Sequence, residues 1–350
     1  MRRWWMRTVT AGLVLVLVAA SCSGDDDDGG AAPDPDAALT LESDVVEGDG
    51  LDTTTTTLPP TTTTTEPPEP LRWLAVGDSY SSGEGLDDAV GDCSRSPRAY
   101  PALAAALLTE AEVAGFASTA CTAAHSDDWP DQWAASTLEE PNLITATFGG
   151  NDVGFVDLMI DCLGLDDSME LLSDAGDLSP GELAEAFLSR GCDRTEAEID
   201  EDLAALQPLL EELYADMAEV VGPEGDVVIL GYPAPVADPD TWPGSRCDGI
   251  SADDGRLLRR AADRLNATIE AATDTRANVH FVDVAPSFEG HGRCGAEPWL
   301  YGPGDLLQRV EDEDGSRLTI AARPFHPTAE GHEAMALVVA SSVDTIVTSS

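Results

Sequence analysis

The feature that most constrains this chain is a series of short apolar runs that alternate with longer helical stretches after Pro70. Predicted strands cover Leu71–Val76, Leu143–Phe148, Val227–Leu230 and Val279–Val282. Predicted helices cover Pro97–Leu108, Ala204–Val221, Asp254–Ala272 and Ala329–Val347. This alternation predicts an α/β fold with a mostly parallel sheet that helices cover on both faces. We expect one such domain over residues 71–350, with an acidic insertion near residues 166–200.

The charge of the 350-residue chain excludes several classes of function. Its 66 Asp and Glu face 18 basic residues, all of them Arg, which gives a formal net charge of −48. A nucleic acid would meet like charge over most of this surface, so we expect no nucleic-acid partner. Because the sequence has no Lys, Schiff-base catalysis and a Ser-Lys dyad are excluded as well.

Residues 1–22 are typical of an export signal. Arg2, Arg3 and Arg7 precede the apolar run Ala11–Ala20, which is too short to span a bilayer. The sequence Ala19-Ala20-Ser21-Cys22 resembles the processing site of bacterial lipoproteins, so we expect Cys22 to carry a lipid anchor. The alternative is an ordinary cleaved signal peptide with an incidental Cys.

Residues 23–70 are rich in Asp, Thr and Pro and contain almost no aromatic or large aliphatic side chains. Such a segment cannot bury enough apolar surface to fold. We expect it to be a disordered tether that carries the domain away from the outer face of the cytoplasmic membrane. A flexible tail on a secreted, unanchored protein would have the same composition.

Six cysteines remain once Cys22 is assigned to the anchor. An even number in an exported chain predicts three disulfides, for which counting alone leaves 15 pairings. The six are Cys93, Cys121, Cys162, Cys192, Cys247 and Cys294. No Cys/His cluster has the spacing of a zinc site, so we expect no metal.

Three chemically useful side chains follow predicted strands or precede the last helix. Ser79 comes at the carboxyl end of the first strand, in the sequence Gly77–Gly85, and Asn151 follows the strand Leu143–Phe148. His326 lies just before the last helix. A Ser hydroxyl needs a base such as His to become a nucleophile, and the resulting oxyanion needs donors such as an Asn amide.

On these motifs the sequence resembles the GDSL/SGNH hydrolases, and more closely the secreted actinobacterial lipases and esterases of that family. The resemblance extends over about residues 71–347. It includes Gly231-Tyr232-Pro233 after a strand and Pro298-Trp299-Leu300 before the His motif. It implies a flavodoxin-like, three-layer α/β/α fold with a parallel five-stranded sheet.

The resemblance also implies roles for individual residues. Ser79 is the expected nucleophile and His326 the base, while the N–H groups of Ser79 and Ala123 and the amide of Asn151 form the oxyanion hole. The implied disulfides join neighbouring cysteines, as Cys93–Cys121, Cys162–Cys192 and Cys247–Cys294.

Two positions depart from the family pattern. Ala123 stands where the second motif usually has Gly, which costs roughly 1 kcal/mol if the site needs a positive φ. Arg323 stands where many members have an Asp that orients the His, so we expect a Ser79–His326 dyad supported by a backbone carbonyl. An acid from elsewhere in the folded part remains an alternative.

The sequence therefore predicts an exported, lipid-anchored serine esterase or lipase that cleaves carboxylic esters through an acyl-enzyme. We expect an ester substrate from a lipid or an acylated glycan, a monomer, and no cofactor. Two alternatives stay open. One is an esterase that removes acetyl groups from polysaccharides, and the other is a surface binding protein of the same fold without turnover.

Overall fold

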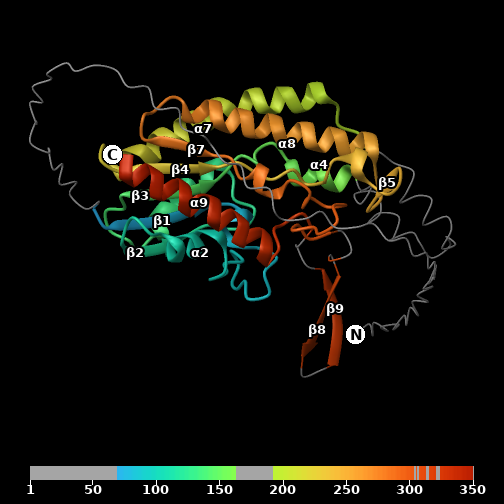
Figure 1. Ribbon diagram of the computed structural model, residues 1–350, viewed down its shortest axis with the longest axis horizontal. Helices are drawn as coiled ribbons and strands as arrows, with labels where there is room; N and C mark the ends of the chain where they lie inside the picture. The colour runs from blue at the N-terminus through green and yellow to red at the C-terminus, as the bar shows by residue number, and fades with distance from the viewer. Residues whose placement is uncertain are drawn as a thin grey trace, which may run out of the picture. The chain divides into compact units, whose positions relative to one another are not determined.

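The computed structural model describes residues 69–162, 192–302, 305, 307–312, 315–320 and 324–349. Its centre is a five-stranded sheet with the order β2-β1-β3-β4-β7, in which every neighbouring pair is parallel (Figure 1). The strands are β1 (Leu71–Gly77), β2 (Val113–Ser118), β3 (Leu143–Thr147), β4 (Asp226–Leu230) and β7 (Val279–Val282). The predicted α/β class with a mostly parallel five-stranded sheet is confirmed.

Helices bury both faces of this sheet because successive side chains of a strand point to opposite sides. Trp73 of β1 packs in one buried cluster with α2 (Tyr100–Leu107) and α9 (Ala329–Ser349). Leu74 belongs to the opposite cluster, which contains α7 (Glu196–Val221) and α8 (Ala252–Thr273). Both side chains have 0% exposure, so the domain has three layers with a core on each side of the sheet.

The predicted helices differ from the observed ones mainly at their first residues. A capping box of Thr195 and Glu198 satisfies the first N–H groups of α7, so this helix begins well before Ala204. Helix α2 begins at Tyr100 rather than Pro97, with Pro101 in its first turn. Most of the predicted acidic insertion lies outside the described residues, and its last residues form the start of α7.

Several elements have no counterpart among the predicted ranges. The edge strand β2 was missed because its sequence VAGFAS alternates small residues with a half-exposed Phe116 and has no continuous apolar run. Further short elements include α1 (Ser79–Ser82), α3 (Trp129–Ala135) and α4 (Phe155–Cys162). Two antiparallel strand pairs are β5 (Arg246–Cys247) with β6 (Ile250–Ser251) and β8 (Leu307–Asp312) with β9 (Gly315–Ile320).

Three disulfides fasten loops around the sheet. They join Cys93 to Cys121, Cys162 to Cys192 and Cys247 to Cys294, which are the pairs that the family resemblance implies. Each closes a loop whose restriction of the unfolded chain stabilises the fold by about 3–4 kcal/mol in the chain-entropy model.

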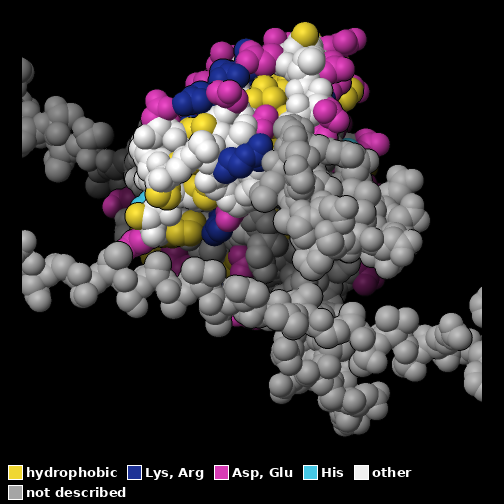
Figure 2. Space-filling view, turned by 90° about the vertical axis from the view of Figure 1, so that its right-hand side faces the viewer, with side chains coloured by type: hydrophobic (Ala, Val, Ile, Leu, Met, Phe, Trp, Pro, Cys, Tyr) yellow, Lys and Arg dark blue, Asp and Glu magenta, His cyan; other side chains and the backbone are white. Residues whose placement is uncertain are grey.

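Acidic side chains are spread widely over the surface. On the face in Figure 2, Asp and Glu (magenta) occur over more of the surface than Arg (dark blue). None of the helices in the described ranges has the length and apolar character needed to cross a membrane. The predicted signal peptide and tether, residues 1–70, lie outside the described part except for Glu69 and Pro70.

The strand order determines where a site can form. The chain leaves β1 for β2 on one side of it and then returns to β3 on the other side, so the connections diverge between β1 and β3. In open α/β sheets, ligands bind at such a switch point, beyond the carboxyl ends of the strands. Gly77 is paired with Thr147 at these ends, which places the residues after β1 and β3 side by side.

Candidate active site

The turn after β1 presents Ser79 as the first residue of α1. Asp78 is the N-cap of this short helix, and its carboxylate accepts a hydrogen bond from the Tyr80 N–H at 3.0 Å. Gly77 has a φ of +118°, and a Cβ at this position would lie 2.4 Å from the carbonyl oxygen of Thr147. Only Gly fits such a close approach of two backbones. Ser79 is therefore fixed at the switch point, with 6% of its surface exposed.

The Asp78 carboxylate connects three strand ends. It accepts hydrogen bonds from the Thr147 hydroxyl (2.7 Å) at the end of β3 and from the Tyr232 hydroxyl just after β4. The Tyr232 oxygen in turn accepts the Gly150 N–H at 3.3 Å. Burial raises the pKa of Asp78 to about 6, even though its hydrogen bonds act in the opposite direction. The ends of β1, β3 and β4 thus share one buried polar network.

Helix α3 also supports the end of β1. The buried side-chain amide of Gln132 accepts the Gly77 N–H and donates to the Gly77 carbonyl, both at 2.8 Å. These two bonds satisfy both backbone groups of the residue where β1 ends. The backbone just before Asp78 and Ser79 is therefore held from a neighbouring layer as well as from the sheet.

The loop before α9 brings His326 to the same place. The Tyr301 N–H donates to the His326 carbonyl at 2.9 Å, and the Phe325 N–H donates to the Tyr301 carbonyl at 2.8 Å. The Tyr80 hydroxyl donates to the Phe325 carbonyl at 2.7 Å, and the rings of Tyr80 and His326 have centroids 5.7 Å apart. Tyr80 directly follows Ser79, so the imidazole of His326 lies beside the turn Gly77–Gly85 that carries the predicted nucleophile, called the nucleophile turn below.

Asn151 and Ala123 come from the two loops that follow β3 and β2. Asn151 Nδ2 donates to the Ala124 carbonyl at 2.9 Å, which leaves the second N–H of this amide available. Ala123 has a φ of +58°, the left-handed conformation in which Gly is favoured over Ala by about 1 kcal/mol. The predicted cost of Ala in place of Gly therefore applies, because the backbone at this position has a positive φ.

Four of the predicted site residues, Ser79, Ala123, Asn151 and His326, thus lie in neighbouring segments near the carboxyl ends of the strands. Arg323 and Cys22 lie outside the described residues. The supporting residues Asp78, Gln132 and Tyr232 were not among the predicted site residues. Asp78 and Tyr232 do lie in the motifs Gly77-Asp78-Ser79 and Gly231-Tyr232-Pro233, whereas Gln132 has no local signal because its partner is distant in sequence.

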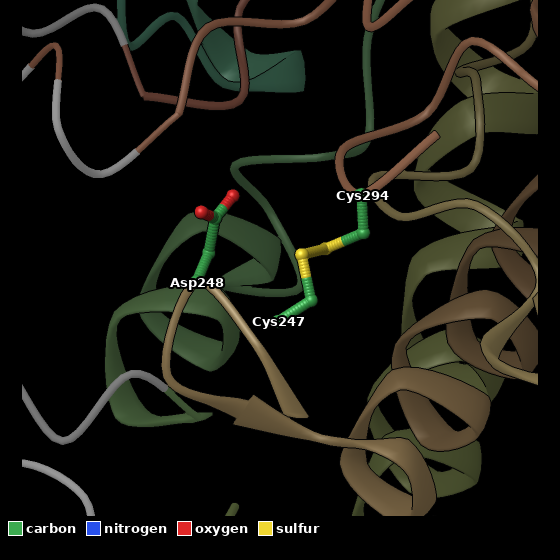
Figure 3. Close-up of side chains that lie close together, drawn as sticks. All are labelled: Cys247, Asp248 and Cys294. Atoms are coloured by element: carbon green, nitrogen blue, oxygen red, sulfur yellow. A yellow bond between two sulfur atoms is a disulfide. The ribbon is translucent and has the colours of Figure 1, made fainter. Parts of the chain in front are cut away.

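A group of potential metal ligands occurs far from these residues in sequence, at Cys247, Asp248 and Cys294 (Figure 3). The two sulfurs form a disulfide and are not thiolate ligands. The Asp248 carboxylate pairs with Arg293 at 2.7 Å. This group is a structural cross-link and does not provide a metal site.

Comparison with known proteins assigns the chain to a family. The model of the GDSL-like lipase/acylhydrolase family matches residues 75–334, which include the turn after β1, the loop after β3 and the His326 segment. The chain belongs to this family.

Relatives of this GDSL-like hydrolase extend the similarity over most of its length. A protein named Lipase from Streptomyces rimosus is 31% identical over 276 residues, which cover 77% of this chain and 85% of the relative. Lipase 1 of Streptomyces coelicolor is 29% identical over 262 residues, covering 74% and 81% of the two chains. The predicted enzyme class, an ester-hydrolysing serine hydrolase, is confirmed.

Two solved structures have the same fold. The phospholipase A1 of Streptomyces albidoflavus NA297 superposes with a TM-score of 0.57 and 27% identity, over 78% of this chain and 99% of that chain. The extracellular lipase of Streptomyces rimosus gives a TM-score of 0.55 and 28% identity over the same shares. The three-layer architecture is therefore shared with ester hydrolases.

The buried Asp78 predicts a specific pH dependence of stability. Its pKa is raised from 3.8 to about 6 in the folded protein, so the fold binds this proton more tightly than the unfolded chain does. The resulting stabilisation is fully present below about pH 4 and is lost as the pH rises through 6. We expect the free energy of unfolding of the wild type, relative to Asp78→Asn, to be up to about 3 kcal/mol larger at low pH than at pH 7.5.

Urea unfolding at a series of pH values measures this difference. Asp263→Asn, at an exposed acid of α8, is the matched control and should show no such trend. A wild-type advantage over Asp78→Asn that grows as the pH rises would contradict the raised pKa.

Proposed function

We propose that this hydrolase cleaves carboxylic esters through an acyl-enzyme on Ser79, with His326 as the general base. The observation that carries the proposal is the convergence of three segments at the β1/β3 switch point. The Tyr80 hydroxyl joins the nucleophile turn to the His326 loop at 2.7 Å, and the Asp78 N–H joins it to the end of β3 at 3.0 Å. Asn151, in the loop after β3, contacts the Ala124 carbonyl at 2.9 Å. Nucleophile, oxyanion donors and base are the three parts that acyl transfer needs.

The proposed reaction has two half-reactions. In the first, His326 takes the proton of the Ser79 hydroxyl while the oxygen attacks the ester carbonyl, and the alcohol leaves with that proton. In the second, water attacks the acyl-enzyme in the same way and releases the carboxylic acid. The oxyanion of each tetrahedral intermediate receives hydrogen bonds from the N–H groups of Ser79 and Ala123 and from the Asn151 amide.

A lipid ester is the proposed substrate class. Two relatives are named lipases and a third is named a phospholipase A1, and each is similar over most of this chain. Acetylated polysaccharide is the competing class. The dependence of hydrolysis on acyl-chain length separates the two, since a lipid esterase retains activity on long chains.

Substitution of the proposed nucleophile and base tests this mechanism. We expect Ser79→Ala and His326→Ala each to lower kcat by about 10⁴-fold or more on p-nitrophenyl esters, because the two residues act as one unit. Asn151→Ala should lower kcat by about 10²-fold with little change in KM. Esters from acetate to palmitate are assayed alongside thermal unfolding, which controls for loss of the fold. Turnover of the Ser79→Ala protein at the wild-type rate would exclude the mechanism.

We also propose that the enzyme is exported and held at the outer face of the cytoplasmic membrane through Cys22. Export is supported by the N-terminal sequence and by the similarity to a lipase described as extracellular. Lipid has to supply the attachment, because an acidic chain with a net charge of −48 is repelled by anionic headgroups. Two acyl chains, at about 0.8 kcal/mol per buried methylene, suffice for stable anchoring.

Replacement of Cys22 tests the anchor. Cys22→Ala should release active enzyme into the medium, because the proposed catalytic residues all lie beyond Pro70. Ser23→Ala is the matched control and should leave the enzyme in the membrane fraction. Wild-type enzyme recovered from the medium without lipid, as determined by mass spectrometry, would disprove anchoring through Cys22.

A further inference from the structure

Glu84 is an acidic residue attached to the nucleophile turn. It lies two residues beyond α1, and its backbone N–H donates to the Ser79 carbonyl at 3.1 Å. Its side chain is only 13% exposed. The Glu84 carboxylate is therefore attached to the same turn as the proposed nucleophile and has little contact with water.

The Glu84 side chain reaches two parts of the proposed site. Its Oε2 atom lies 3.5 Å from Nε2 of His326, and the same oxygen accepts a hydrogen bond from the Thr122 hydroxyl. Thr122 directly precedes Ala123, and its own N–H donates to the Cys93 carbonyl at 3.3 Å. The loop that carries the proposed oxyanion donor therefore holds the carboxylate against the imidazole.

This geometry has a direct electrostatic consequence. When His326 takes the Ser79 proton, the imidazole becomes a cation in a largely buried site, which costs free energy unless an anion lies close by. A carboxylate 3.5 Å away is within the range at which an opposite charge favours the charged form. The position where many family members have an Asp is occupied by Arg323, so the sequence provides no acid there.

Two other titratable groups that face His326 in the described residues, Tyr80 and His332, carry no charge near pH 7. Tyr80 stays neutral because burial raises its pKa above the ordinary value. His332, on α9, stays neutral because burial and the field of His326 lower its pKa to about 3. Asp78, whose charge raises the pKa of Tyr80, is hydrogen-bonded within the network between the strand ends. The Glu84 carboxylate lies directly against the imidazole and brings a negative charge to its Nε2 edge.

We propose that Glu84 is a positioning residue that stabilises the imidazolium form of His326, with Thr122 holding its carboxylate in place. This inference rests on the proposed function, in which His326 is the base. In each half-reaction the proton moves from the Ser79 hydroxyl or from water to His326 and then to the leaving group. The Glu84 carboxylate acts only through its position beside the imidazole and does not receive this proton.

The variant Glu84→Gln removes the charge but keeps the shape of the side chain and an oxygen that can accept from Thr122. The test is kcat/KM for a p-nitrophenyl ester from roughly pH 5 to pH 9, measured on the full chain. We expect kcat to fall about tenfold or more while KM changes little. The acidic limb of the profile should move to lower pH by at least about half a unit, because the imidazolium has lost its anion.

Two further variants separate charge from structure. Asp92→Asn removes an exposed acid from the same loop region and should leave the profile unchanged. Glu84→Asp keeps the charge one methylene farther back, so its acidic limb should stay nearer the wild-type position than that of Glu84→Gln. Thr122→Val should lower kcat in the wild-type background and have a much smaller effect in the Glu84→Gln background.

The outcomes distinguish this inference from the proposed function. If Ser79→Ala is inactive but Glu84→Gln leaves kcat and the acidic limb unchanged, the role of Glu84 is disproved and the mechanism stands. Equal losses in the Asp and Gln variants with an unmoved limb also overturn it, because charge is then irrelevant. Activity that persists in Ser79→Ala refutes the proposed function itself.

Discussion

The buried carboxylate of Asp78 joins the ends of three strands. It accepts hydrogen bonds from Thr147 at the end of β3 and from Tyr232 after β4, and it caps the helix that starts at Ser79. Burying a carboxylate is costly, and the pKa of about 6 reflects that cost. In return, the backbone at Ser79 has a defined position relative to Gly150, whose N–H bonds the same Tyr232 oxygen. The proposed nucleophile and the loop of the proposed oxyanion donor Asn151 therefore form parts of one hydrogen-bonded assembly.

Tyr80 connects this assembly to the proposed base. It bonds Asp78 through its backbone N–H and the Phe325 carbonyl through its hydroxyl, so one residue spans the distance between the sheet edge and the His326 loop. The backbone pairing of Tyr301 with Phe325 and His326 supports that loop from the other side. Preorganisation of this kind means that little reorganisation is needed when charge develops during acyl transfer.

The parts that sequence could predict are those with a local signal. Strands such as Leu143–Thr147 are fully buried and therefore contain only apolar residues and Thr. Ser79, Asn151 and His326 occupy motifs at strand or helix ends. The edge strand β2 was missed because one half-exposed face removes that signal. Gln132 is hydrogen-bonded to Gly77, and Glu84 contacts His326. Both pairs join segments that are distant in sequence, so only the folded chain brings them together. Ala123 is an intermediate case. The motif identified the position from sequence, but only the structure shows that its backbone has a φ of +58°, where Gly is favoured.

The central claim is that the network around Asp78 presents Ser79 as a nucleophile that becomes acylated. Trapping the intermediate tests this claim most directly. The enzyme is mixed with a p-nitrophenyl ester, quenched in acid within the first turnovers, digested and analysed by mass spectrometry. The account predicts that the peptide containing Ser79 gains the mass of the acyl group and that fragmentation places it on the Ser79 side chain. Acylation of a different residue, with Ser79 unmodified while the ester is hydrolysed, would contradict it.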